Sequence, residues 1–371
     1  MGGFRSPGLI CDPETSLNYT DDVESARKIL YTAEDAVIVP ILMSVIVGLG
    51  LLTNSIFLLV VIRVHHMRTA TNHYLVQIAL ADIIYLIFGA GEKVVRFAVS
   101  PVNVDMKWMG TAGCLLVPLL RSLAYFAVLF FMAFVTREKY LAICKPLKYR
   151  AINGGQRVWT TLTAWGAALL IAASLAPCSS VFSPYCITWP SAWIPSDLPS
   201  LAAQCRPVSE WLNTYNDVMQ TFPFFLVMFL TLSMHICIIK TLRVQVAAQT
   251  EDLQGPITAR KMQTRRQVTR MLVLNGILFF SLLAPFECCS IASSTRMYTT
   301  HQLLTSDQFS LLLQIARTLA YLQAAINPLV YYLLHPRYRK ACVETFSRGG
   351  STNRQYVNTT DRSNVIAWPK K

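Results

Sequence analysis

The chain has 371 residues, of which 53% are hydrophobic and only 14% are charged. Soluble globular domains carry about 25% charged residues, so this composition excludes an ordinary large soluble protein and favours one that faces lipid. The net charge of +13 would suggest a nucleic-acid partner in a soluble chain, but we expect no nucleic acid here, because the charges follow a membrane pattern.

Seven runs along the chain are long enough to cross a bilayer, since a spanning helix needs about 20 mostly apolar residues. None alternates strictly between apolar and polar residues, as β-barrel strands do. The sequence therefore predicts an all-α membrane protein built as a seven-transmembrane helix bundle. The runs cover residues 36–62, 74–98, 111–143, 158–181, 218–240, 268–292 and 309–334.

Lysine and arginine residues gather at alternate ends of these runs. Basic clusters follow the first, third, fifth and seventh runs, whereas the residues before the first run are mainly acidic. Because basic loops stay in the cytoplasm, we predict an extracellular amino terminus and a cytoplasmic carboxyl terminus in the plasma membrane. Asn18 begins an Asn-Tyr-Thr sequence in the predicted outer tail and is a predicted glycosylation site.

Polar residues occur at similar depth in three runs. Asp82 lies in the second run, Asn54 in the first and Asn327 in the seventh. A carboxylate at this depth is costly unless it faces protein, water or an ion, so we predict a shared polar site. Three separately satisfied polar groups are the alternative.

Further charged residues lie near the predicted outer ends of the runs. Intramembrane charges usually mark function, so we predict that they face a water-filled cavity that opens outward. Ion pairs that only hold the helices together are the alternative. The charged residues are Glu92, Lys93, Arg96, Arg121, Glu287 and Arg317, and all except Lys93 are predicted ligand-binding residues.

Five prolines interrupt the runs and predict kinks at which the bundle can bend. They are Pro118, Pro177, Pro223, Pro285 and Pro328.

A set of motifs, in this order, resembles a rhodopsin-like (class A) G-protein-coupled receptor over about residues 36–346. The motifs are Gly50-x-x-x-Asn54, Leu80-Ala81-Asp82, Trp108 before Cys114, Glu138-Lys139-Tyr140, Trp165, Pro223, Phe279 with Pro285, and Asn327-Pro328-Leu329-Val330-Tyr331.

The resemblance implies four segments. These are an extracellular tail (1–35), a seven-transmembrane domain (36–334), a short amphipathic eighth helix on the inner membrane surface (335–346) and a cytoplasmic tail (347–371). In the eighth helix, Tyr338 and Val343 would face lipid. Cys342 would be a palmitoylation site.

The resemblance also implies a disulfide between Cys114 and a cysteine of the second outer loop. Cys205 is chosen from the candidates Cys178, Cys186 and Cys205, because its distance from Pro223 is similar to that in many family members. Cys11 is then expected to pair with Cys178 or Cys186.

The implied switch begins at Glu138, which would hold Lys139 by a local ion pair in the resting receptor. On activation Lys139 would turn toward the G protein, while the inner part of the sixth helix swings outward about Pro285. The family usually has arginine at this position, and lysine keeps the charge without the planar fork. The other predicted switch residues are Tyr140, Phe279, Asn327, Pro328 and Tyr331.

Besides Lys139, three positions depart from the family pattern. Thr231 replaces a tyrosine, and Leu283 replaces a tryptophan. Val128 stands where a polar residue often lines a sodium site, so we expect sodium to bind at Asp82 weakly or not at all. No other cofactor and no metal site is expected.

The ligand is predicted to be an extracellular peptide, as for neuropeptide receptors, because both signs of charge line the predicted cavity. Arg121 would repel an amine, and the seventh run has no lysine for retinal. The alternatives are a receptor for a small acidic metabolite, with Glu92 as an internal partner of the arginines, and a weakly coupling decoy. A transporter or channel is the alternative outside the family, although the runs show no paired repeats. We find no catalytic motif and expect no enzyme; the expected partners are the peptide, a heterotrimeric G protein and the bilayer.

Overall fold

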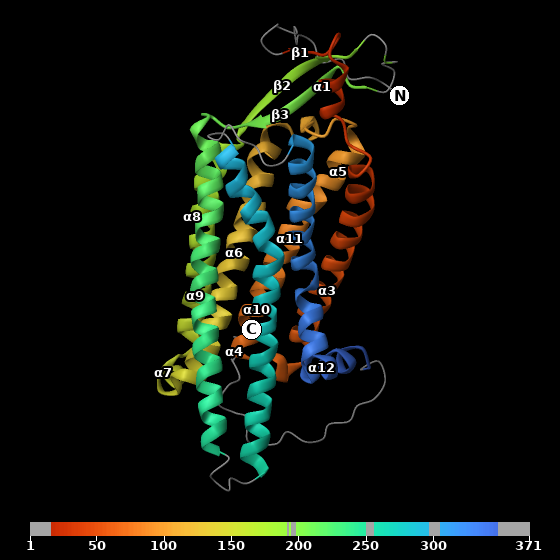
Figure 1. Ribbon diagram of the computed structural model, residues 1–371. Helices are drawn as coiled ribbons and strands as arrows, with labels where there is room; N and C mark the ends of the chain where they lie inside the picture. The colour runs from red at the N-terminus through yellow and green to blue at the C-terminus, as the bar shows by residue number, and fades with distance from the viewer. Residues whose placement is uncertain (1–15, 191–192, 194–197, 250–255, 297–304, 348–371) are drawn as a thin grey trace.

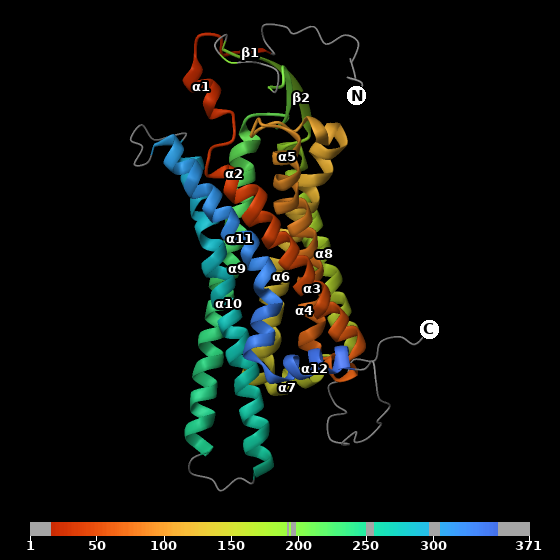
Figure 2. The same ribbon diagram turned by 90° about the vertical axis from the view of Figure 1, so that its right-hand side faces the viewer.

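The computed structural model describes residues 16–190, 193, 198–249, 256–296 and 305–347. Among these, seven helices are long and apolar enough to cross a membrane, and they run side by side as one bundle (Figures 1 and 2). The predicted seven-helix fold is therefore confirmed. The spans are Asp35–Arg63, Ala70–Val99, Lys107–Cys144, Gly154–Cys178, Trp211–Gln245, Thr269–Ser294 and Ser306–Leu334.

The first two spans are interrupted by π-helical turns. The first consists of α2 (Asp35–Val37), a π-helical turn and α3 (Ser44–Arg63). The second consists of α4 (Ala70–Tyr85), a π-helical turn and α5 (Glu92–Val99). Such π-helical turns are frequent at functional sites, and the one in the second span directly precedes the charged residues of α5.

The other spans are mainly single helices. The third is α6 (Gly110–Cys144) and is followed by the short α7 (Pro146–Ala151). The fourth is α8 (Gly154–Leu175), which starts with an Asn153 capping box and ends in a 3-10 turn that contains Pro177. The fifth, sixth and seventh lie in α9 (Trp211–Gln249), α10 (Pro256–Arg296) and α11 (Ser306–Leu334).

Four of the five prolines lie inside helices as predicted: Pro118, Pro223, Pro285 and Pro328. The prediction for Pro177 is wrong. It lies where the fourth span ends, and Val181 already begins a strand. The predicted fourth run extends beyond the helix because the strand that follows is also apolar.

The core lies between the helices, and small residues there permit close packing. Ala324 and Ala325 of α11 are fully buried. A Cβ at Gly50 of α3 would overlap Leu86 Cδ1 and lie 3.0 Å from Ala325 Cβ, so glycine favours the close approach of α3 to α11. Large apolar side chains such as Ile41 and Phe222 are exposed on the outside, as expected for a surface that contacts lipid.

One end of the bundle carries a small sheet, and we call it the sheet end. Strand β1 (Ser16–Asn18) pairs in parallel with β2 (Val181–Thr188), which pairs antiparallel with β3 (Leu201–Arg206). With α1 (Val23–Lys28), the strands enclose a separate apolar cluster around Tyr185 and Trp189. These strands were not predicted from the sequence.

The opposite end carries α12 (Pro336–Ser347), which lies across the bundle, and we call it the α12 end (Figure 2). The predicted eighth helix is therefore present. Val343 is 61% exposed, as expected for a side chain that faces lipid. The prediction for Tyr338 is wrong, because its ring packs against Phe57 and Tyr331 and its hydroxyl donates to Asn72.

Candidate functional site

A cavity of about 220 Å³ lies between the spanning helices in the half of the bundle nearer the sheet. Side chains from α4, α5, α6, α9, α10 and α11 line it. Its charged lining residues are Lys93, Arg121, Asp217 and Arg317, and the tyrosines Tyr85, Tyr125 and Tyr321 also contribute to its wall.

Of the five predicted ligand-binding residues, the structure brings Arg121 of α6 and Arg317 of α11 to the wall of this cavity. Lys93 and Asp217 also line it, although the sequence analysis had not assigned either to the ligand. Asp217 lies six residues after the start of α9 and directly before residue 218, where the predicted fifth span begins. Its carboxylate accepts hydrogen bonds from Ser294 and Asn216.

Glu92 and Arg96 form a buried ion pair one helical turn apart on α5. Arg96 Nε lies 3.1 Å from Glu92 Oε1, and the two residues are 5% and 8% exposed. Lys93 Nζ is 3.9 Å from the same carboxylate. For these residues the structure supports the alternative of an internal pair, because Glu92 is already engaged by cations of its own helix.

Glu287 of α10 is fully buried. Its Oε1 accepts a hydrogen bond from the Tyr125 hydroxyl at 2.7 Å, and Oε2 has no hydrogen-bond partner among the described residues. Since Tyr125 lines the cavity, Glu287 can influence a ligand through that hydroxyl.

The predicted polar site is partly connected. Asn327 donates to Asp82 Oδ2 at 2.8 Å and accepts from Gln323 at 2.9 Å. Asn54 instead donates to the backbone carbonyls of Gly50 and Ala324, which joins α3 to α11. Gln323 was missed, although it lies four residues before Asn327 and therefore on the same helical face.

Sodium at Asp82 remains a prediction. Asp82 Oδ1 is buried without a hydrogen-bond partner, which suits a cation ligand. The Asn327 carboxamide oxygen, however, is already used by Gln323, and Val128 adds no oxygen. A hard cation needs several oxygen ligands, so these residues fit sodium poorly.

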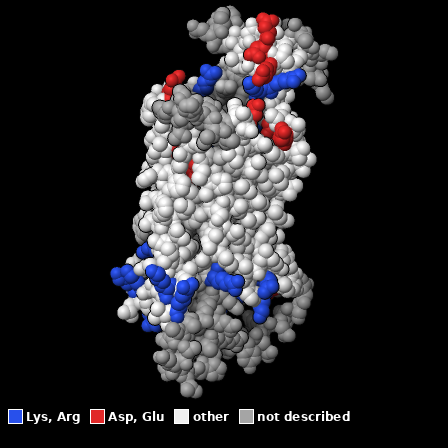
Figure 3. Space-filling view, viewed as in Figure 1, with Lys and Arg blue, Asp and Glu red and all other residues white. Residues whose placement is uncertain are grey.

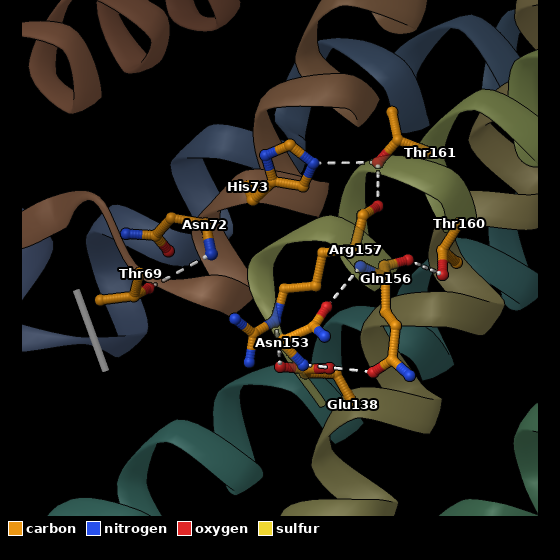
Figure 4. Close-up of polar contacts among 9 residues, drawn as sticks. All are labelled: Thr69, Asn72, His73, Glu138, Asn153, Gln156, Arg157, Thr160 and Thr161. Atoms are coloured by element: carbon orange, nitrogen blue, oxygen red, sulfur yellow. Dashed lines mark hydrogen bonds and ion pairs between the residues drawn. The ribbon is translucent and has the colours of Figure 1, made fainter. Parts of the chain in front are cut away.

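Near the α12 end, Glu138 of α6 faces Arg157 of α8, with Oε1 and Nε 3.6 Å apart (Figure 4). Glu138 is 2% exposed. The sequence analysis had named only Lys139 as its partner; a cation from the fourth span, distant in the chain, could not be identified from local spacing. Burial raises the pKa of the neighbouring Tyr149, and the charge of Glu138 raises it further.

Three other predicted switch residues contact neighbouring side chains. Tyr331 is buried and its hydroxyl accepts from Asn275 of α10 at 3.5 Å, which bridges the sixth and seventh spans. Phe279 is buried against Phe280. The ring of Tyr140 lies under the Lys145 ammonium group, 5.7 Å from its centroid.

The structure contains the disulfide Cys114–Cys205, which joins the start of α6 to β3 as expected. Cys186 is also disulfide-bonded and Cys178 is free, so Cys178 is not the second partner that was considered. Cys11 lies outside the described residues. Asn18 is exposed on β1, and Cys342 is a half-buried free thiol on α12, so glycosylation and palmitoylation stay predictions.

Residues 53–331 match the family described as "7 transmembrane receptor (rhodopsin family)". The thyrotropin-releasing hormone receptor of Gallus gallus is 27% identical and aligns over 87% of this chain and 82% of its own length. Human neuromedin-U receptor 1 is 27% identical and aligns over 95% of this chain and 85% of its own length. The human motilin receptor is 25% identical and aligns over 85% of this chain and 82% of its own length.

Proposed function

Because the chain belongs to the rhodopsin family of seven-transmembrane receptors, we propose that it is a plasma-membrane receptor that binds an extracellular peptide and activates a heterotrimeric G protein. Similarity over most of both chains to receptors named for thyrotropin-releasing hormone, neuromedin-U and motilin is the observation that carries the proposal. The family match over residues 53–331 includes the residues that line the cavity.

The charge distribution supports an orientation with the sheet end outside the cell. Lysine and arginine form a belt at the α12 end, acidic residues are concentrated at the sheet end, and the band between them is almost free of charge on the face shown in Figure 3. Basic flanks stay cytoplasmic, so the cavity would open outward and α12 would lie at the inner surface. An epitope placed before Ser16 should then be accessible to antibody on intact cells.

We propose that signalling proceeds by population shift. An agonist binds the active arrangement more tightly than the resting one, and the G protein does the same from the other side. The proposed movement separates α10 from α6 at the α12 end, with the bend at Pro285. Tyr331 and Asn275 contact each other across the moving surfaces, and Lys139 provides the cation for the G protein.

A screen of peptide hormones against cells that express the chain, with calcium and cyclic-AMP readouts, tests the proposal. We expect at least one peptide to give a response that is absent from untransfected cells. A Lys139→Glu variant should bind that peptide and fail to signal. A peptide that binds while every G-protein class stays silent would contradict the signalling proposal and indicate a decoy.

A further inference from the structure

Neither cavity arginine forms an ion pair within the described part of the chain. The guanidinium groups of Arg121 and Arg317 also form no hydrogen bond in that part. Both arginines are half-buried, and an arginine in a membrane segment is normally paired because removing its charge from water is costly. We therefore look for a negatively charged partner of these guanidinium groups outside the described protein atoms.

The nearby acids are already engaged. Glu92 is shared by Arg96 and Lys93. Asp217 accepts hydrogen bonds from Ser294 and Asn216, and Glu287 accepts one from Tyr125. None of the three lies within ion-pair distance of either cavity arginine. Asp217 also lines the cavity, but no acid of the described chain forms an ion pair with Arg121 or Arg317.

The cations also act on one another. Arg121 and Arg96 repel Arg317, and the charges of Arg121 and Arg317 act on Lys93. An anion placed between α6 and α11 would remove this repulsion and satisfy both guanidinium groups. The planar forks of arginine bind a carboxylate through paired, charge-assisted hydrogen bonds, which makes a carboxylate the natural occupant.

The size of the cavity limits what enters it. Pockets that enclose a complete drug-sized ligand measure about 300–1,000 Å³. This cavity, at about 220 Å³, holds only one end of a peptide. Tyr85 and Tyr321, whose ring centroids are 5.4 Å apart, form part of its wall.

We propose that the ligand inserts a carboxylate into this cavity, where Arg121 and Arg317 bind it from α6 and α11, with Lys93 as a third positive charge. The inference deepens the proposed peptide function and rests on it. The carboxylate has two sources in a peptide, a free carboxyl terminus or an acidic side chain, and a small organic acid offers the same group.

The ligand test uses every peptide that activates the receptor in the screen. Each is synthesised with a free carboxyl terminus, as the carboxyl-terminal amide, and with its Asp and Glu replaced by Asn and Gln. One neutralised form should lose about 30-fold or more in potency, as expected when a buried charge pair loses one partner. On Arg317→Gln that difference between forms should disappear. Equal potency of all forms on the unmodified receptor would overturn the inference and leave the peptide function intact.

If small aliphatic and aromatic monocarboxylates activate the receptor and peptides do not, the peptide function fails and the carboxylate site stands, provided that Arg121→Gln and Arg317→Gln remove the response. The second measurement needs no ligand. It compares the melting temperatures of the empty full-length receptor and its variants. Arg121→Gln and Arg317→Gln should each raise the melting temperature, since they remove an unpaired charge.

Arg96→Gln is the matched control. It neutralises a buried arginine at the same end of the bundle, but one that is paired with Glu92, so it should lower the melting temperature. If all three variants lower it equally, the cavity arginines have internal partners and the inference is wrong.

Discussion

The two ends of the bundle differ in how the charged side chains inside it are paired. At the sheet end, Arg121 and Arg317 face a cavity that Asp217 also lines, but no carboxylate of the described chain lies within ion-pair distance of either guanidinium group. At the α12 end, Glu138 is buried and paired with Arg157 across two helices. A charge without a partner is available to a ligand, whereas a paired charge stabilises the arrangement that contains it. Under the proposed function, this difference would place ligand recognition at the sheet end and stabilisation of the resting state at the α12 end.

The two ends also differ in how the peripheral segments are attached to the helix bundle. The sheet end is joined covalently, by Cys114–Cys205, and the α12 end by packing and hydrogen bonds such as that between Tyr338 and Asn72. A disulfide keeps a loop in place while the helices below it move. Noncovalent contacts can exchange when the bundle changes shape, which suits the end where the G protein would bind.

The largest expected effect comes from Cys205→Ser. The disulfide spans 91 residues of sequence, and removing a bond of this kind typically costs about 2–5 kcal/mol. We expect a large decrease in melting temperature and in the amount of receptor at the cell surface. Cys178→Ser, which changes a free thiol in the same region, is the control and should have little effect. Similar losses in both variants would show that the cysteine side chain, not the bond, matters.

The next largest effect on stability is expected from Glu138→Gln. It keeps the size of the side chain but leaves Arg157 without its partner, and we expect a loss of about 2 kcal/mol, reduced because Arg157 is partly exposed. Basal G-protein activation should rise. Combining it with Arg157→Gln should cost less than the sum of the single changes. Strict additivity in this double-mutant cycle would show that the two residues do not interact.

Tyr338→Phe should destabilise the docking of α12 by about 1 kcal/mol, because it removes one hydrogen bond and keeps the packed ring. Hydrogen exchange of the α12 amides measures this directly, and faster exchange is expected. Val343→Ser changes an exposed side chain of the same helix and serves as the control. Unchanged exchange in Tyr338→Phe would mean that the ring contacts alone hold α12.

The smallest expected effect is a dependence on pH. Burial, with the charges of Arg337 and Lys139, lowers the pKa of His335 from 6.5 to about 4. The unfolded chain therefore binds this proton first, and stability contributed by the neutral ring is lost as the pH falls from about 6.5 toward 4. His335→Gln should show a smaller decrease in melting temperature between pH 7.5 and 5 than the unmodified receptor. An equal decrease would contradict this assignment.

The bundle was predictable because its signals are local and repeated. Length, apolar composition and basic flanks located all seven spans, and the motif register located Cys114 and Asn327. The strands β2 and β3 were not predicted, because a short apolar stretch such as Val181–Thr188 continues the hydrophobic pattern of the preceding span. Neither length nor composition shows where the spanning helix ends and the apolar strand begins.

The partners of individual charges were much harder to predict. Glu92 and Arg96 are four residues apart, and their shared helical face was evident from the sequence, yet whether that face meets a cavity or packed protein depends on helix rotation. Arg157 and Asp217 acquire their roles from contacts between helices that are distant in the chain. Single-sequence patterns contain no information about such contacts.

The most direct test of the contrast between the ends is the melting temperature of the ligand-free receptor after one charge is neutralised at each end, in the same buffer and lipid. We expect Arg317→Gln to raise it and Glu138→Gln to lower it. A decrease in both variants would contradict the account, because it would show that the cavity charges are as well satisfied by protein as those at the α12 end.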